Sequence, residues 1–160
     1  METTTALIEQ LDKARQEVEA ELVDIDPNLP ICPGWTIKHL VAHLTGWDEV
    51  ATLALRAYNV GREPVTAPVQ GIDAYNAQSV AKRQALSYNH IVKEWEVARD
   101  LLKAALLAVP EQKIDAPLLY PWGPTGSVRE LVAIYEQHER EHATELRRMK
   151  AVPARPAEAR

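Results

Sequence analysis

Apolar residues recur at intervals of three and four along four long stretches of the chain, and this spacing decides the fold class. The stretches cover about residues 4–25, 36–60, 72–109 and 127–150. Such an interval places apolar side chains on one face of an α-helix. The alternation of every second residue that is typical of strands is not found in the pattern. Helices with one apolar face each must bury those faces against one another, so the sequence predicts an all-α protein, a four-helix bundle.

Polar residues at the ends of these stretches support the helix boundaries. Thr36 and Ser127 each precede an apolar stripe and are suited to cap a helix N-terminus. Ser127 with Glu130 forms the S-x-x-E pattern of a capping box. Ser87 is a third candidate cap and predicts a break in the stretch 72–109 near residues 86–87, before Pro110 ends it.

Length and composition predict one domain without disulfides. The chain has 160 residues, of which 46% are apolar, and a single cysteine cannot form an internal disulfide. We expect the bundle to occupy residues 1–150 and residues 151–160, which carry two prolines, to form a flexible C-terminal tail. The net charge of −5 argues against a nucleic-acid partner, and no apolar stretch is long enough for a membrane helix, so a cytoplasmic location is the default expectation.

Four of the five histidines form two H-x-x-x-H pairs, His39 with His43 and His138 with His142. His138 and His142 take the next positions of the apolar stripe after Tyr135, so both should face inward, one helical turn apart. His43 lies on the buried stripe of the second stretch, whereas His39 lies at its edge. Other residues around His138 are expected on the outer faces of the helix, namely Glu136, Gln137, Glu139, Arg140 and Glu141.

Three inward imidazoles need partners, because a buried polar group without a hydrogen bond costs on the order of 1–3 kcal/mol. One divalent ion would serve His43, His138 and His142 together, and His39 is a candidate fourth ligand. The alternative is that these are hydrogen-bonded core histidines. His43 lies roughly 10 Å from the start of its helix, and the other two lie roughly 15 Å from the end of theirs. These distances place the three histidines at similar heights along the bundle if the two helices are antiparallel. An antiparallel arrangement requires a crossover connection through residues 61–71.

Two sequence blocks resemble the DinB/YfiT-like superfamily. Residues 33–49 resemble its second helix, and residues 127–142 resemble its fourth. The superfamily includes the N-terminal domain of mycothiol-dependent maleylpyruvate isomerase and ClbS-like proteins. The resemblance implies a four-helix bundle with a crossover. It also implies a zinc or nickel ion on His43, His138 and His142, in some members together with a low-molecular-weight thiol, and often a homodimer.

Three neutral histidines leave an open coordination position, which is the pattern of a catalytic metal site. We therefore expect a metal-dependent hydrolase or thiol-dependent transferase of a small molecule. The alternative is a non-catalytic metal-stabilised bundle that serves as a binding or dimerisation module. Candidate acid–base groups are Glu49 and Glu141, with Asp48 also near a ligand. Candidate walls of a substrate pocket are Trp47, Tyr120 and Trp122.

Overall fold

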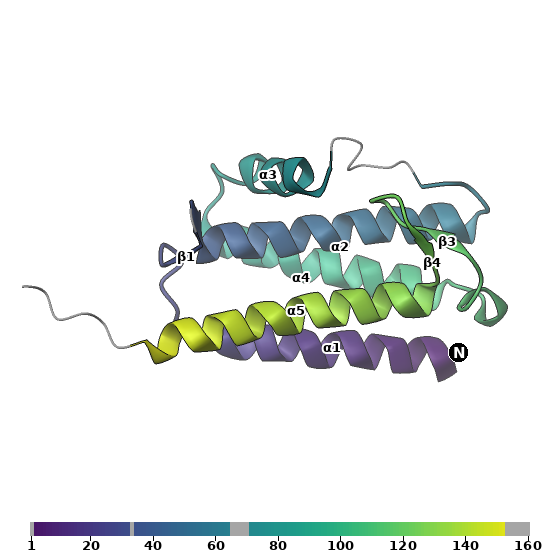
Figure 1. Cartoon of the computed structure of the whole chain (residues 1–160), viewed down its shortest axis with the longest axis horizontal. Helices are drawn as coiled ribbons and strands as arrows, with labels where there is room; N and C mark the ends of the chain where they lie inside the picture. The colour runs from purple at the N-terminus through teal and green to yellow at the C-terminus, as the bar shows by residue number, and fades with distance from the viewer. Residues whose placement is uncertain (1, 33, 65–70, 153–160) are drawn as a thin grey trace, which may run out of the picture.

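The computed structural model describes residues 2–32, 34–64 and 71–152, and within these ranges it contains five α-helices. They are α1 (Glu2–Leu22), α2 (Ile37–Asn59), α3 (Ile72–Lys82), α4 (Tyr88–Leu107) and α5 (Val128–Ala151). The helices α1, α2, α4 and α5 form a bundle, and α3 lies outside it against α2 (Figure 1). The predicted all-α bundle is confirmed. The stretch 72–109 is two separate helices, and only the second of them, α4, belongs to the bundle.

The chain connects the bundle helices with one crossover (Figure 1). Side-chain contacts fix the directions: Asp48 on α2 pairs with Arg99 on α4, and Asn59 near the end of α2 reaches the carbonyl of Ala105, so these helices are parallel. The helices α2 and α5 are antiparallel, as predicted. The return from the end of α2 to the start of α4 runs through α3 as well as the preceding connection, of which residues 65–70 lie outside the described residues.

Two short antiparallel ribbons flank the bundle. The first pairs β1 (Pro30–Cys32) with β2 (Trp35–Thr36), directly before α2, and the second pairs β3 (Leu118–Leu119) with β4 (Thr125–Gly126), before α5. A 3-10 turn, η1 (Glu111–Lys113), follows α4. The sequence pattern missed these strands because two or three residues are too few to show an alternation of apolar and polar side chains.

Two of the three predicted caps form as side-chain hydrogen bonds, with one change at α5, whereas Thr36 is the N-cap residue of α2 without a side-chain cap hydrogen bond. The Ser87 and Ser127 hydroxyls accept hydrogen bonds from the backbone N–H groups of His90 and Glu130. The second half of the capping box is absent, because the Ser127 N–H donates to the Tyr120 hydroxyl instead of the Glu130 side chain. Gly126 permits this arrangement, since a Cβ there would overlap the Tyr120 ring.

Four charged side chains from the four bundle helices meet in the interior. We call them the buried quartet: Arg15 on α1, Asp48 on α2, Arg99 on α4 and Glu139 on α5, each no more than 5% exposed. The Glu139 Oε1 atom lies 2.7 Å from Arg15 Nη2 and 2.6 Å from Arg99 Nη2. Asp48 Oδ2 lies 2.8 Å from Arg15 Nη2 and 2.9 Å from Arg99 Nε. The expectation that Glu139 takes an outer face is therefore wrong, because two arginines from other helices hold it inside.

The outer helix α3 is fixed to α2 by a close approach at Gly46. The Tyr75 hydroxyl donates to the Gly46 carbonyl, 2.5 Å away, and the Ser79 side chain occupies the space that a Cβ on residue 46 would need. At the other end of α3, the buried guanidinium of Arg83 pairs with Glu49 of α2 and with Glu94 of α4. These contacts place one face of α3 beside the middle of α2.

The C-terminal boundary differs slightly from the expectation. Ala151, placed in the tail by sequence, is the last residue of α5, and residues 153–160 of the expected tail lie outside the described residues. None of the helices in the described ranges combines the length and the apolar character needed to cross a membrane.

Candidate metal centre

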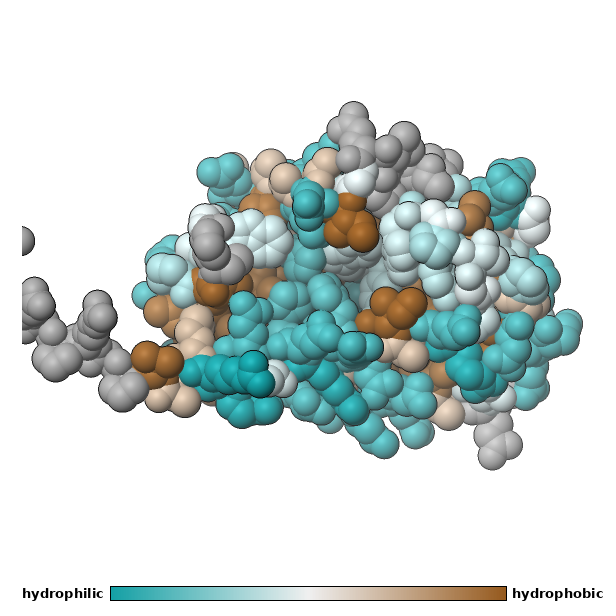
Figure 2. Space-filling model, in the orientation of Figure 1, coloured by the Kyte–Doolittle hydropathy of each residue, from teal (hydrophilic) through white to brown (hydrophobic). Residues whose placement is uncertain are grey.

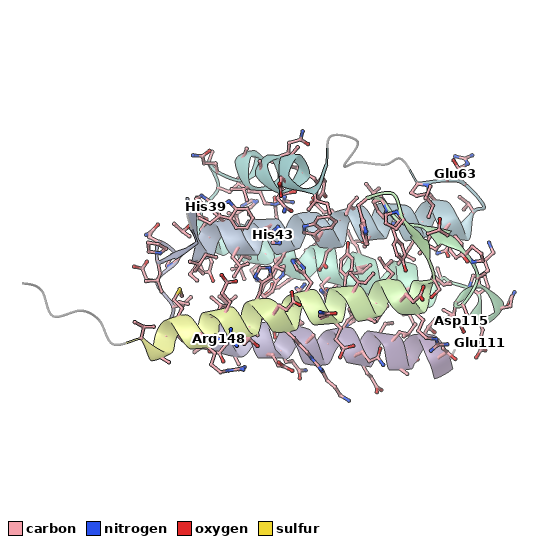
Figure 3. The ribbon with its side chains drawn as sticks, viewed as in Figure 1. His39, His43, Glu63, Glu111, Asp115 and Arg148 are labelled. Carbon is pink, nitrogen blue, oxygen red and sulfur yellow. The ribbon has the colours of Figure 1, made fainter. Side chains whose placement is uncertain are left out.

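The three inward histidines converge between α2 and α5. His43 Nε2 lies 3.1 Å from His138 Nε2, and His142 Nε2 lies 3.1 Å from the same atom. One ring nitrogen from each residue lies within 4.8 Å of the others. His43 is buried and follows His39 by one turn along α2 (Figure 3), while His138 and His142 are half-buried on successive turns of α5. The predicted clustering of these three side chains is confirmed.

Burial keeps the imidazoles of His43 and His138 neutral. The pKa of His43 is lowered to about 3, chiefly by desolvation and in smaller part by the neighbouring imidazoles of His138 and His142. Desolvation is also the main reason why the pKa of His138 is lowered to about 4, and the neighbouring His142 contributes to this shift. A neutral imidazole offers the lone pair that a metal ion needs.

The donor set fits a metal better than it fits hydrogen bonding alone. An imidazole nitrogen has one in-plane site for a proton or a lone pair, so His138 Nε2 can hydrogen bond well to only one of its two neighbours. Three nitrogens that share one zinc ion at tetrahedral geometry lie about 3.3 Å apart. The observed contacts of 3.1 Å are close to that separation.

The imidazole rings of His142 and His43 are held in place by different kinds of contact. His142 Nδ1 lies 3.2 Å from Glu145 Oε2, an arrangement that orients an imidazole ligand and fixes its tautomer. His43 Nδ1 is buried without a hydrogen-bond partner among the described residues. The His43 ring is instead held by packing, since the Trp35 ring lies 5.1 Å away and the Trp47 ring 6.4 Å away.

A cavity of about 400 Å³ is lined in part by His43 and His138. Its other described lining residues come from α2, α3, α5 and the turn after β3: Trp47, Ile72, Asn76, Trp122, Ile134, Tyr135, Gln137 and Glu141. A larger, open depression of about 690 Å³ runs along the exposed face of α5 and has no histidine in its described lining. The cavity that reaches the imidazoles is therefore the candidate site.

The structure places the candidate site residues in two groups. Trp47, Trp122 and Glu141 line the cavity beside the histidines. Tyr120 does not line it, although its ring packs 4.9 Å from Trp122 and its hydroxyl hydrogen bonds to Ser127, so it supports a wall from behind. Glu49 also lies outside the lining, because Arg83 holds its carboxylate beside α3.

The remaining histidines and Asp48 have other environments. His39 is not part of the cluster, since its Nδ1 accepts a hydrogen bond from the Thr36 N–H and so caps α2. His90 is exposed at the first turn of α4, 3.5 Å from Glu94. Asp48 belongs to the buried quartet and cannot reach the cavity without breaking two arginine pairs.

The structure also shows a cavity wall from α3, a helix that the predicted four-helix bundle does not include. Asn76 on α3 accepts a hydrogen bond from Trp47 Nε1 at 2.8 Å and thereby holds the indole ring. Tyr135, on the floor of the cavity, donates to the Trp47 carbonyl at 2.7 Å. Both contacts orient the same tryptophan at the cavity's edge.

Residues 4–141 match the family described as the mycothiol maleylpyruvate isomerase N-terminal domain. The chain belongs to this family. His43 and His138 lie inside the matched segment, and His142 follows it directly. An uncharacterised protein present in two strains of Mycobacterium tuberculosis is 33% identical over 79 residues. That match covers 49% of this chain and 31% of the relative, so the chain aligns with about a third of its curated relatives' length.

Solved structures share the fold of this family member at low sequence identity. A mycothiol-dependent maleylpyruvate isomerase has a TM-score of 0.74 and 17% identity, over 89% of this chain and 60% of that one. The colibactin self-resistance protein ClbS, crystallised with double-stranded DNA, has a TM-score of 0.76 and 14% identity, over 94% and 97% of the two chains. These similarities confirm the DinB/YfiT-like fold.

Proposed function

We propose that this chain is a metal-dependent enzyme that activates a low-molecular-weight thiol for transfer to or from a small molecule. The observation that carries the proposal is the convergence of three imidazole nitrogens beside a cavity that two of the three histidines, His43 and His138, line. A zinc or nickel ion held by His43, His138 and His142 would supply Lewis acidity and lower the pKa of a coordinated thiol or water. The preference for a thiol is supported by the family match and by the mycothiol-dependent relative.

The residues of this chain supply the rest of the site. His43 and His138 present lone pairs because their burial keeps them neutral. Glu141 lies at the cavity mouth, where Gln137 Nε2 donates to its Oε1 at 2.8 Å, and we propose it as the acceptor of the thiol proton. Glu49 is the other candidate carboxylate, and we propose that it instead anchors α3 through Arg83.

The buried quartet argues for a functional metal over a purely structural one. Arg15, Asp48, Arg99 and Glu139 already join all four bundle helices through buried ion pairs. A metal that bridges only α2 and α5 adds little to this connection. We therefore favour catalysis over the alternative of a metal-stabilised binding or dimerisation module.

The experiment loads the purified chain with cobalt(II) and adds 2-mercaptoethanol. We expect the d–d spectrum of a bound ion and a saturable thiolate-to-cobalt charge-transfer band, both lost in His138→Ala. If the ion binds but no thiolate band forms, the thiol proposal is wrong. Hydrolysis of p-nitrophenyl acetate by that metal-loaded protein would then indicate a hydrolase, and its absence would favour the non-catalytic module.

Partners beyond a small molecule are also proposals. We propose a homodimer and no nucleic-acid partner, the latter supported by the net charge of −5. The DNA in the ClbS crystal belongs to that protein's structure. A gel-shift assay with a DNA duplex at low salt tests this directly, and a shift at micromolar protein would contradict it.

A further inference from the structure

The walls of the cavity beside the histidines are aromatic. Trp47 and Trp122 meet edge to face with ring centroids 5.7 Å apart, and Tyr135 lies on the floor. The hydrogen bonds of Trp47 to Asn76 and of Tyr135 to the Trp47 carbonyl hold this surface in place. The polar atoms of Trp47 and Tyr135 are thus already bonded within the protein, and the surfaces left toward the cavity are their apolar ones.

The mouth of the cavity carries apolar side chains that the fold does not bury. Ile72, the first residue of α3, is 48% exposed, and Ile134 on α5 is 43% exposed. Both line the cavity. Figure 2 shows a recess on this face between α3 and α5, with hydrophobic surface on both sides. Isoleucines exposed on opposite sides of a recess are suited to contact an apolar ligand.

The charge of the lining has one sign. Among the described residues that line the cavity there is no lysine or arginine, and Glu141 is the only carboxylate. The Asn76 oxygen is engaged by Trp47, and the Gln137 amide donates to Glu141. The described lining therefore has no cationic side chain to receive a carboxylate or phosphate on the substrate body.

We propose that the cavity takes a small substrate with an uncharged aromatic or branched apolar body, and that Glu141 disfavours substrates with a carboxylate beside that body. The inference rests on the proposed function for the position of the thiol and adds the class of molecule that is attached to it. A volume of about 400 Å³ is within the usual range of small-molecule sites.

The preference for an aromatic body and the disfavour toward a carboxylate should differ in their effect on affinity. Burial of a phenyl group against two indole rings should raise affinity by about ten-fold or more. Glu141 is exposed at the mouth, so solvent screens its charge, and its effect on a nearby carboxylate should be about five-fold. The aromatic preference is therefore the main expectation.

The experiment compares three thiols on the cobalt-loaded chain, followed by the thiolate band: 2-mercaptoethanol, 2-phenylethanethiol and mercaptosuccinate. We expect 2-phenylethanethiol to bind about ten-fold more tightly than 2-mercaptoethanol, and mercaptosuccinate to bind more weakly than either. Trp122→Ala should remove the advantage of the phenyl group. Because Glu141 is also the proposed acceptor of the thiol proton, its charge effect is measured as a ratio of two affinities. Glu141→Gln should raise the affinity for mercaptosuccinate relative to that for 2-mercaptoethanol about five-fold, while Glu136→Gln, on the same helix and outside the cavity lining, should leave this ratio unchanged.

A metal-free arm separates this inference from the proposed function. Saturation-transfer NMR on the metal-free chain with 2-phenylethanol, which lacks the thiol, should show binding to the wild type and none to a folded Trp122→Ala variant. If cobalt does not bind but this result is obtained, the proposed function fails and the aromatic preference stands. Equal affinity for the three thiols, or 2-phenylethanol binding that is unchanged by Trp122→Ala, would overturn the inference.

Discussion

The substitution Glu139→Gln tests the role of the buried quartet. It keeps the size of the side chain and removes one of two carboxylates that neutralise Arg15 and Arg99. Burial raises the pKa of the Glu139 carboxyl, and Arg99 and Arg15 oppose that rise. We take the group as charged, because its Oε1 lies within 2.7 Å of both guanidinium groups, which stay protonated at any accessible pH.

The expected loss follows from the charge that remains. In the variant, Asp48 alone faces two guanidinium groups that are no more than 5% exposed. Removal of one partner from a buried ion pair costs about 3–5 kcal/mol. A protein of this size typically unfolds with about 5–15 kcal/mol, so the loss is a large fraction of the total. The melting temperature should fall by about 6–20 °C.

Urea unfolding of the metal-free chain measures this loss without interference from the metal. The matched control is Glu136→Gln on the same helix, where the lost partner is the exposed Arg140 and the cost should be about 0.5 kcal/mol or less. The double variant Glu139→Gln/Arg15→Gln restores neutrality around Asp48 and Arg99, so it should recover about 1 kcal/mol or more of the loss. The reasoning is refuted if Glu139→Gln costs no more than the control, or if the double variant is less stable than the single one.

Three further predictions concern titration, packing and assembly. The pKa values of His43 and His138 lie below the ordinary 6.5, so the stabilisation they provide is present above pH 6.5 and is lost as the pH falls toward 4. Urea unfolding of the metal-free chain should show a decline of about 1.4 kcal/mol per pH unit for each group, which a His43→Gln variant should reduce. Gly46→Ala should destabilise the chain by about 1–3 kcal/mol despite the better helix propensity of alanine, because a Cβ there overlaps the Ser79 side chain. In thermal melts, Ser79→Gly should restore part of the stability lost in Gly46→Ala. A Gly46→Ala variant as stable as wild type would show that α3 does not need the close approach. Light scattering should give the mass of a dimer, and a monomer at every concentration would remove that proposal.

The helices and the histidine cluster could be predicted because both depend on local periodicity. A side chain at a given step on a helix has a defined direction, so apolar stripes located the bundle helices and showed that His138 and His142 share a face. The comparison of levels along the helices then predicted the crossover. The sequence did not predict that α3 forms part of the crossover between α2 and α4. The stretch 72–109 contains two helices, and its apolar pattern does not show which of them enters the bundle.

The buried quartet escaped prediction, although the sequence contains a signal for it. Each member follows a buried apolar residue by four positions and so occupies the next place on a stripe. Charged residues are usually assigned to solvent, because a single buried charge is costly. Two arginines and two acids on the stripes of four different helices could, however, neutralise one another. The pairs are Leu11 with Arg15, Leu44 with Asp48, Trp95 with Arg99, and Tyr135 with Glu139.

The cavity was only partly predictable for a different reason. Trp47 was located because it follows His43 by one turn on the same helix. The walls that come from α3 and from the turn after β3 depend on how these segments fold over the bundle. That arrangement rests on single contacts, such as the Tyr75 hydroxyl on the Gly46 carbonyl and the Tyr120 hydroxyl on Ser127. Individual hydrogen bonds of this kind leave no periodic pattern in the sequence.

The central claim is that His43, His138 and His142 bind one divalent ion. The most direct test is elemental analysis of the purified chain after incubation with zinc and gel filtration, with His138→Ala and the exposed-histidine variant His90→Ala treated in parallel. We predict one ion per chain in the wild type and in His90→Ala, and little or none in His138→Ala. A wild-type chain without metal, or a His138→Ala chain that retains as much as the wild type, would contradict the claim.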